Sequence, residues 1–251
     1  MASIDLNADL GETVGGVPTA DDEAMFALIS SANVACGGHA GDDASMREAA
    51  RRAVRTGVAV GAHPSFPDPA GFGRESMRMP PAALQAAVAA QIAALLDAGA
   101  DVRYVKPHGA LYHAVTARRD DARAVIAAVV TISERVGRAL PILGMDGEIG
   151  LAARAAGLGF FREAFLDRAY LPTGLLVPRS ASGALVTDAE RIGERAVRFA
   201  TDGTVEAVDG TIVHVDAASL CLHGDSPSAV ASARAARAVL DAQGIEVRAP
   251  W

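Results

Sequence analysis

The chain of 251 residues alternates short apolar runs with longer, Ala-rich amphipathic segments. Each apolar run has the length of a strand and changes character at its end. A last short run, Ile245–Arg248, could close or edge a sheet. The runs predicted as the main strands are Ile4–Ala8, Ala32–Cys36, Ala59–His63, Tyr104–His108, Ile142–Met145, Phe160–Phe165 and Ser219–His223.

Glycine, proline and capping residues mark where the amphipathic segments begin and end as helices. Thr187 and Glu190 have the spacing of a capping box, in which each side chain satisfies a free backbone donor. The other predicted helices run from Asp42 to Thr56, from Pro80 and Pro81 to Gly99, from about Asp120 to Val136, from a cap at Asp146 to near Gly157, and from Ser226 and Pro227 to Gly244.

This alternation predicts a parallel sheet with crossover helices, and hence an α/β fold. The strands with polar ends are spread from residue 5 to residue 225. An open sheet would gather only the ends near its switch point, whereas a closed barrel brings all of them to one mouth. We therefore predict a single catalytic domain over residues 1–251, built as a distorted, TIM-like (β/α) barrel with seven or eight strands.

Two segments interrupt the alternation. Residues 204–214 are predicted to form a β-hairpin around Asp209-Gly210, inserted on the barrel. Residues 171–183 contain two prolines and three residues able to bind anions, namely Arg179, Ser180 and Ser182. This segment is predicted as a long loop near the mouth.

Polar side chains collect on one face of the first predicted strand. Period-two geometry places Asp5, Asn7 and Asp9 together, with Ile4, Leu6 and Ala8 on the opposite face against the helices. Carboxylates inside a barrel are costly unless they are paired, hydrated or bound to something. The alternative is an edge strand whose acids are solvated.

Further polar residues end the other strands. Lys106 and His108 share a face, and burial is expected to lower the pKa of the lysine so that it can bind an anion or transfer a proton. Glu163 and Asp167 lie on one face around Phe165, although a surface ion-pair run is plausible for Arg162. The remaining members of this set are Asn33 and His39 after the second strand, His63 before Pro64, and His223. His39 taken alone could equally be a loop residue without a chemical role.

Composition and charge narrow the class of protein. Hydrophobic residues make up 51% of the chain and aromatic residues only 4%, which suits buried parallel strands under Ala-rich helices. The net charge of −7 is spread along the chain, so binding of nucleic acid is not expected. Cys36 and Cys221 are predicted to be buried thiols. We recognise no secretory signal and no membrane span, so the expected location is the cytoplasm.

Taken together, the motifs resemble the LamB/YcsF family in the same order over nearly the full chain. Those that carry the resemblance are Asp5-Leu-Asn7-Ala-Asp9-Leu-Gly11-Glu12, Ala32-Asn33-Val-Ala-Cys36-Gly-Gly38-His39-Ala-Gly41-Asp42, Gly61-Ala-His63-Pro-Ser65-Phe-Pro67-Asp68, Gly71-Phe-Gly73-Arg74, Val105-Lys106-Pro-His108-Gly-Ala-Leu-Tyr112, Glu163-Ala-Phe165-Leu-Asp167-Arg168-Ala-Tyr170, Val177-Pro-Arg179 and Cys221-Leu-His223-Gly-Asp225.

The resemblance implies a barrel related to the polysaccharide-deacetylase fold. It also implies the role of the A subunit of an ATP-dependent 5-oxoprolinase, which cleaves 5-oxo-L-proline to L-glutamate in a complex with subunits B and C. The chain contains no Gly-x-x-x-x-Gly-Lys-Ser/Thr phosphate loop. If ATP is consumed, another chain is therefore expected to supply much of its binding site.

We hypothesise that subunits B and C phosphorylate the lactam oxygen and that this chain opens the activated ring with water. Asp9 or Asp5 would act as the general base, Lys106 and Arg179 would hold phosphate or carboxylate, and His63 and His108 would transfer protons. The predicted catalytic residues are Asp5, Asn7, Asp9, His63, Lys106, His108 and Glu163, and the predicted substrate-binding residues are Asn33, His39, Arg74, Arg179 and His223.

Two alternatives remain open at this point. A divalent-metal amidohydrolase or deacetylase acting on an N-acyl sugar would use Asp9, His39 and His63 as its metal ligands. The family resemblance does not itself imply a metal, and none is predicted outside that alternative. The other alternative is a non-catalytic subunit, because a barrel fold does not fix a function.

Overall fold

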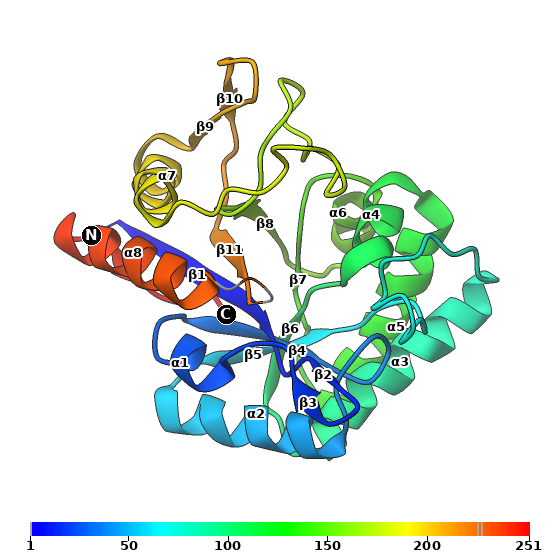
Figure 1. Cartoon of the computed structure of the whole chain (residues 1–251). Helices are drawn as coiled ribbons and strands as arrows, with labels where there is room; N and C mark the ends of the chain where they lie inside the picture. Colours follow the sequence, from blue (N-terminus) through cyan, green and yellow to red (C-terminus); the bar gives the residue numbers. More distant parts are fainter. Residues whose placement is uncertain (1, 225, 227) are drawn as a thin grey trace.

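A closed parallel barrel forms the centre of the computed structural model, which describes residues 2–224, 226 and 228–251 (Figure 1). The pairing of β11 with β1, in which Ser219 lies opposite Asp5, closes the sheet. Within the described residues, the barrel consists of seven strands in the order β1 (Ser3–Leu10), β4 (Ser31–Ala35), β5 (Ala59–His63), β6 (Val102–Val105), β7 (Ile142–Gly144), β8 (Phe160–Phe165) and β11 (Ser219–His223). The prediction of a β/α barrel is therefore confirmed.

The short strand β12 (Glu246–Val247) pairs with the start of β1 and extends the edge of the sheet outside the closed ring. At the same end of the barrel, the ring of Trp251 stacks on Tyr104 with 3.9 Å between centroids. The indole Nε1 donates a hydrogen bond of 3.2 Å to Ser31 Oγ. Aromatic packing therefore covers the barrel end opposite the carboxyl termini of the strands.

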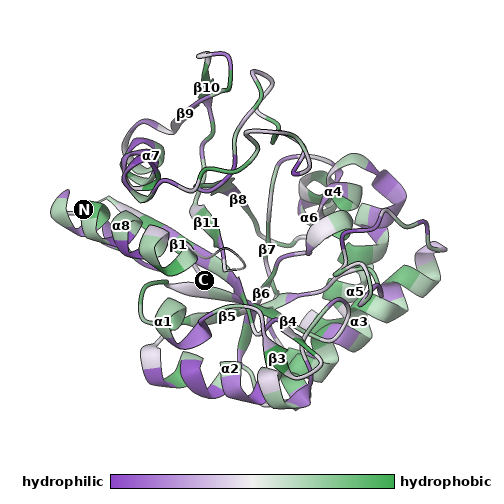
Figure 2. Cartoon of the chain, viewed as in Figure 1, coloured by the Kyte–Doolittle hydropathy of each residue, from purple (hydrophilic) through white to green (hydrophobic). Residues whose placement is uncertain are grey.

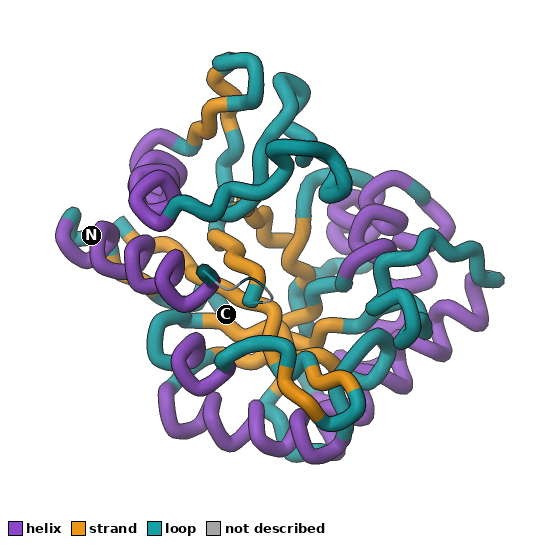
Figure 3. The backbone as a smooth tube through the Cα atoms, viewed as in Figure 1, coloured by secondary structure: helices purple, strands orange, loops and turns teal. Residues whose placement is uncertain are grey.

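Helices surround the barrel on the outside (Figure 3). In α2, the buried residues Met46, Ala49, Ala50 and Ala53 recur at the spacing of one helical face. Figure 2 shows hydrophilic residues alternating with the hydrophobic ones along this helix. The helices are α1 (Asp22–Phe26), α2 (Asp43–Thr56), α3 (Pro81–Asp97), α4 (Gly109–Ala117), α5 (Arg119–Val136), α6 (Glu148–Ala155), α7 (Ala189–Asp202) and α8 (Ala229–Ala242). No helix of the described residues is long and apolar enough to span a bilayer.

The two faces of β1 separate as the sequence predicts. Ile4, Leu6 and Ala8 belong to the apolar core under the helices. Asp5 and Asn7 have no solvent exposure and Asp9 is 5% exposed, so the alternative of a solvated edge strand is wrong.

Strand β6 ends earlier than predicted, at Val105 rather than His108. Pro107 has no N–H to donate to a ladder. The next residue, His108, is already the N-cap of α4, a helix that the sequence analysis did not predict. The chain here stays fixed by backbone hydrogen bonds, from Lys106 N to Ala62 O and from His108 N to Pro64 O. Lys106 and His108 therefore extend from a tightly held strand end.

Three predicted helix starts need correction. Asp188 caps α7 by accepting from Arg191 N, so the capping box of Thr187 and Glu190 is not formed. Gly147 precedes α6, and Asp146 instead pairs with an arginine of β8. Helix α8 begins at Ala229 with Ser228 as its N-cap. Pro227, which was predicted to start it, and Asp225 of the last motif lie outside the described residues.

Two β-hairpins of the described residues lie outside the barrel sheet. β9 (Thr204–Glu206) and β10 (Ile212–His214) pair antiparallel, which confirms the predicted insertion, and Figure 1 shows this hairpin projecting from the barrel. The second hairpin, β2 (Thr13–Val14) with β3 (Val17–Pro18), was not predicted. Its turn residues Gly15 and Gly16 both have positive φ, as a type I′ hairpin turn requires.

Candidate active site at the barrel mouth

A cavity of about 540 Å³ opens at the carboxyl ends of the barrel strands. Ligand sites in β/α barrels are formed at this end, because the strand-to-helix loops meet there. The charged and polar side chains that line the cavity are Asp9, His63, Arg74, Ser76, Lys106, His108, Tyr112, His113, Arg118, Arg168, Arg179, Ser180 and His223.

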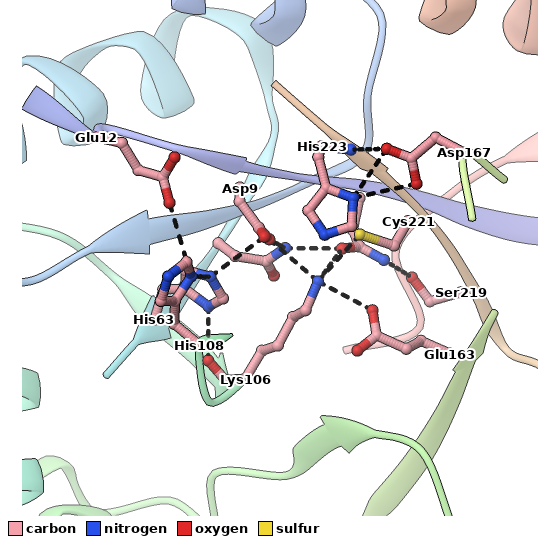
Figure 4. Close-up of polar contacts among 12 residues, drawn as sticks. Asp9, Glu12, His63, Lys106, His108, Glu163, Asp167, Ser219, Cys221 and His223 are labelled. Atoms are coloured by element: carbon pink, nitrogen blue, oxygen red, sulfur yellow. Dashed lines mark hydrogen bonds and ion pairs between the residues drawn. The ribbon is translucent and has the colours of Figure 1, made fainter. Parts of the chain in front are cut away.

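Lys106 lies at the centre of the site between two carboxylates (Figure 4). Its Nζ is 3.0 Å from Asp9 Oδ1 and 3.0 Å from Glu163 Oε2. It also lies 3.1 Å from both Asn7 Oδ1 and Cys221 Sγ. Burial disfavours the charged amine, but Asp9, Cys221 and Glu163 outweigh it and raise the pKa of Lys106 well above its usual value. The expectation of a lowered lysine pKa is therefore wrong, because it left out these partners.

Asp9 uses both of its carboxylate oxygens. Its Oδ1 accepts a hydrogen bond of 2.8 Å from Asn33 Nδ2 and also faces Lys106 Nζ. Its Oδ2 lies 3.3 Å from His63 Nε2. Burial acts to raise the pKa of Asp9, but His63 and Lys106 outweigh it and hold this pKa well below its usual value. Asp9 is therefore a stable anion on the cavity wall and a weak base.

Asp5 occupies a different environment although it shares a strand face with Asp9. Ser30, Ser31 and Ser219 all donate hydrogen bonds to its carboxylate. Burial is the largest influence and raises the pKa of Asp5 to about 6. Asp5 is absent from the described cavity lining, so it does not have the position expected of a general base.

Asn7, Asn33 and Glu163 support the site from behind the cavity wall. Asn33 Nδ2 bonds Asn7 Oδ1 at 2.7 Å, and Tyr104 donates to Asn33 Oδ1 at 2.6 Å. Asn7 in turn donates to Ser219 Oγ at 2.7 Å. These predicted site residues are brought together, but they contact Lys106 and Asp9 and do not line the described part of the cavity.

Three histidines form a compact group beside Asp9. His63 Nε2 and His108 Nδ1 are 3.0 Å apart, and both residues line the cavity. The ring of His39 stacks on that of His108, with 3.7 Å between centroids, and its Nε2 lies 3.1 Å from Glu12 Oε1. His39 is therefore behind His108 and outside the described cavity lining, unlike the predicted substrate contact.

Burial keeps two of these histidines from charging. Burial, with a smaller contribution from Arg74, lowers the pKa of His39 to about 4. Burial, and then His63 and His39, lower the pKa of His108 well below its usual value. Glu12 was not predicted as a site residue. It ends the first motif, Asp5 to Glu12, and its membership of that motif was the signal that could have identified it.

The predicted metal set is not assembled as expected. The ligand atoms of Asp9 and His63 lie together with one of His108, all within 4.8 Å of one another. His39 belongs to a separate group with Glu12 and His108. His108 therefore takes the place that the sequence analysis gave to His39.

Asp167 and His223 form a hydrogen-bonded pair on the other side of Asp9 from the three histidines (Figure 4). The Nδ1 of His223 is 2.8 Å from Asp167 Oδ2, and the backbone N–H of His223 donates to the same oxygen at 2.9 Å. Burial opposes charge on His223, but Asp167 outweighs it and raises the pKa of His223. A carboxylate that holds one ring nitrogen leaves the other nitrogen oriented for proton transfer. No role for Asp167 was predicted from the sequence.

The cavity wall is electropositive. Its described lining includes Arg74, Arg118, Arg168 and Arg179, with Asp9 as the carboxylate. Arg118 is paired with Asp121. Arg74 and Arg179, which were predicted to bind substrate, are part of this wall. Such a wall favours an anionic ligand.

The fold and the cavity define a β/α-barrel protein with a polar cavity, rich in cationic side chains, at the barrel mouth. Residues 4–250 match the model of the LamB/YcsF family. The chain belongs to this family, as the motifs of the sequence indicate.

Named relatives match along their full length. The chain is 47% identical to a 5-oxoprolinase A subunit of Agrobacterium fabrum, covering 99% of this chain and 98% of that one. It is 50% identical to the 5-oxoprolinase A subunit of Streptomyces coelicolor, covering 98% and 99%. The crystal structure of a lactam utilization protein from Thermus thermophilus superposes with a TM-score of 0.91 at 45% identity, covering 98% and 99%.

A more distant likeness concerns the fold alone. A structure described as T48 deacetylase with substrate superposes with a TM-score of 0.51 at 12% identity, covering 98% of this chain and 87% of that one. This likeness agrees with the predicted relation to deacetylase barrels.

Proposed function

We propose that this chain is the A subunit of an ATP-dependent 5-oxoprolinase and that it catalyses the ring-opening step of 5-oxo-L-proline hydrolysis to L-glutamate. The names of the full-length relatives support its place in such a complex. The observation that carries the catalytic role is the cavity itself, where Lys106, His63, His108 and His223 face a space of about 540 Å³. A scaffold protein has no need of such a site.

The cavity suits a small anionic lactam. The carboxylate of 5-oxoproline would bind the guanidinium groups of Arg74 and Arg179 on the wall. The volume lies within the range of about 300–1,000 Å³ that is usual for ligand sites. It leaves room for a phosphoryl group on the lactam oxygen beside the substrate ring, and the excess of cationic side chains favours that group as well.

The division of labour follows from the chemistry of the amide. A lactam is stabilised by resonance, and phosphorylation of its oxygen by ATP makes the ring carbon electrophilic. Water then adds to that carbon, the C–N bond breaks as the nitrogen takes up a proton, and the product is an acyl phosphate. A second water hydrolyses the acyl phosphate to glutamate and inorganic phosphate. Since the chain contains no phosphate loop, subunits B and C would perform the phosphorylation.

The geometry revises the expected roles within the site. His223, held by Asp167, is the better candidate to take the proton from water, because the low pKa of Asp9 makes it a poor base. Lys106, fixed by Asp9 and Glu163, would stabilise negative charge on the oxygen of the water that adds to the ring carbon. ATP and the partner chains would place the reaction in the cytoplasm.

The test is glutamate formation from isotopically labelled 5-oxoproline in defined mixtures of the purified subunits. We expect glutamate only when this chain, subunits B and C, and ATP are all present. Ring opening by this chain alone, without ATP, would show that no activated species is needed. Glutamate formation by B and C without this chain would remove its catalytic role.

A further inference from the structure

The hydrogen bonds of His63 and His108 determine which nitrogen of each ring carries a proton. His63 Nδ1 is 2.7 Å from the carbonyl oxygen of Lys106, and His108 Nε2 is 3.0 Å from that of Phe72. A carbonyl oxygen only accepts, so each of these nitrogens must donate an N–H. A neutral imidazole has one N–H, and the opposite nitrogen of each ring is therefore a lone-pair acceptor.

These two lone-pair nitrogens face each other. His63 Nε2 and His108 Nδ1 are 3.0 Å apart, with no hydrogen between them in the neutral rings. Asp9 Oδ2, also an acceptor, lies 3.3 Å from His63 Nε2. Three acceptors thus converge at a buried point, and an arrangement of this kind is unfavourable unless a cation occupies the space between them.

We propose that Asp9 Oδ2, His63 Nε2 and His108 Nδ1 bind one divalent transition-metal ion of the zinc or cobalt type. Bonds of about 2.0–2.2 Å in a tetrahedral site place neighbouring ligand atoms about 3.3–3.6 Å apart. The observed separations of 3.0 Å and 3.3 Å are close to these values. Imidazole and carboxylate together are ligands that suit such ions.

The surroundings of the three ligands also fit a metal. Ligating histidines commonly donate their other N–H to a backbone carbonyl, as both rings do here. Glu12 Oε1 lies 3.7 Å from His108 Nδ1 and adds negative charge next to the site.

The position of the site gives the ion access to a ligand. Asp9, His63 and His108 all line the cavity. Three protein ligands with a fourth position open to solvent are typical of catalytic rather than structural metal sites. The inference goes beyond the proposed function and does not depend on it, because metal binding can be measured without lactam turnover.

The experiment uses the full chain after treatment with chelator, and Co²⁺ is the probe. Calorimetry and the visible absorption of bound Co²⁺ should show one ion per chain. We expect His63→Asn and His108→Asn each to weaken binding by about 100-fold or more, since loss of outer-sphere partners alone costs about 10–100-fold. His113→Asn alters an exposed histidine of the same cavity and should bind Co²⁺ as the unaltered chain does.

Circular dichroism and thermal unfolding establish that each variant is folded. If both ligand variants unfold, X-ray absorption spectroscopy of the Co²⁺-loaded unaltered chain identifies the ligands of the ion. Two imidazole ligands are expected. The proposal is overturned by an absence of saturable Co²⁺ binding, which would indicate that a shared proton joins the two rings. It is equally overturned by binding that neither variant weakens, or by fewer than two imidazoles at the ion.

Discussion

Asp5 and Asp9 lie on the same face of one strand, yet their carboxylates have opposite properties. Three neutral serine hydroxyls hold Asp5, and burial raises its pKa to about 6. Burial acts on Asp9 as well, but His63 and Lys106 outweigh it and lower the pKa of Asp9. In a barrel, acids at the closed end and at the mouth can share a sequence pattern, and the charge of their neighbours decides which one can take part in chemistry.

The largest effect is expected from Lys106→Met, which removes the cation that distinguishes the two environments. Turnover of the complete complex should fall by about 10²–10³-fold, since a preorganised cation is lost from the reacting oxygen. Removing one partner of a buried ion pair also costs about 3–5 kcal/mol of unfolding free energy. Steady-state kinetics and urea unfolding measure the two losses.

A matched control separates the two losses in Lys106→Met. Adding Glu163→Gln removes a carboxylate that faces Lys106 from behind the described cavity lining. The double variant should regain part of the unfolding free energy and none of the turnover. Recovery of turnover together with stability would mean that Lys106 acts only in folding.

Asp167→Asn should have the next largest effect, because His223 loses the carboxylate that orients it. We expect kcat to fall by about 10²-fold, the lower end of what a general acid or base contributes. Asp167 raises the pKa of His223, so without it the limb on which activity rises with pH should move to lower pH.

The pH–rate profile of the complex measures this shift. Asp216→Asn, which alters an exposed partner of Arg162, is the control and should leave the profile unchanged. An unshifted limb in Asp167→Asn would show that another group takes the proton.

Asp5→Asn should change the pH dependence of stability more than activity. The folded pKa of about 6 lies above the reference value of 3.8, so the folded state binds the proton more tightly. The stabilisation is full below pH 3.8 and is lost as pH rises to about 6. Over that range, the unaltered chain should lose about 3 kcal/mol more unfolding free energy than the variant. Urea unfolding at several pH values checks this, and parallel curves would contradict it.

The smallest effect is expected on the outer surface. Arg162 pairs with Asp146 at 3.1 Å and with Asp216 at 2.7 Å, and its side chain is 42% exposed. Ion pairs this exposed contribute little, so Arg162→Ala should cost about 0.5 kcal/mol or less in urea unfolding. A loss of unfolding free energy as large as that of Lys106→Met would mean that burial does not determine how much these ion pairs contribute to stability.

The barrel could be predicted because period-two patterning and helix punctuation are local signals. The position of Asp5, Asn7 and Asp9 on one face follows from β1 alone. The hairpin of residues 204–214 was found for the same reason. Helix α4 was missed, since the strand was predicted to continue through Pro107 to His108, and only residues 106–108 separate β6 from the helix.

The site was only partly predictable, because its pairings join residues far apart in the chain. Nothing near Lys106 in the sequence shows that Glu163 will lie 3.0 Å from it, so the direction of its pKa shift was wrong. His39 was grouped with Asp9 by motif, whereas the fold stacks it behind His108. Asp167 was visible in a motif, but its hydrogen bond to His223 depends on the pairing of β8 with β11.

An active site at the barrel mouth is tested most directly by comparing the rate of glutamate formation by the complete complex with Asp9→Asn and with Asp5→Asn. We expect Asp9→Asn to lower the rate by about 100-fold or more, because Lys106 and His63 lose the carboxylate that positions them. Asp5→Asn should lower it by less than about tenfold, since Asp5 lies outside the described cavity lining. Equal losses, or full turnover in both variants, would contradict an active site at the barrel mouth.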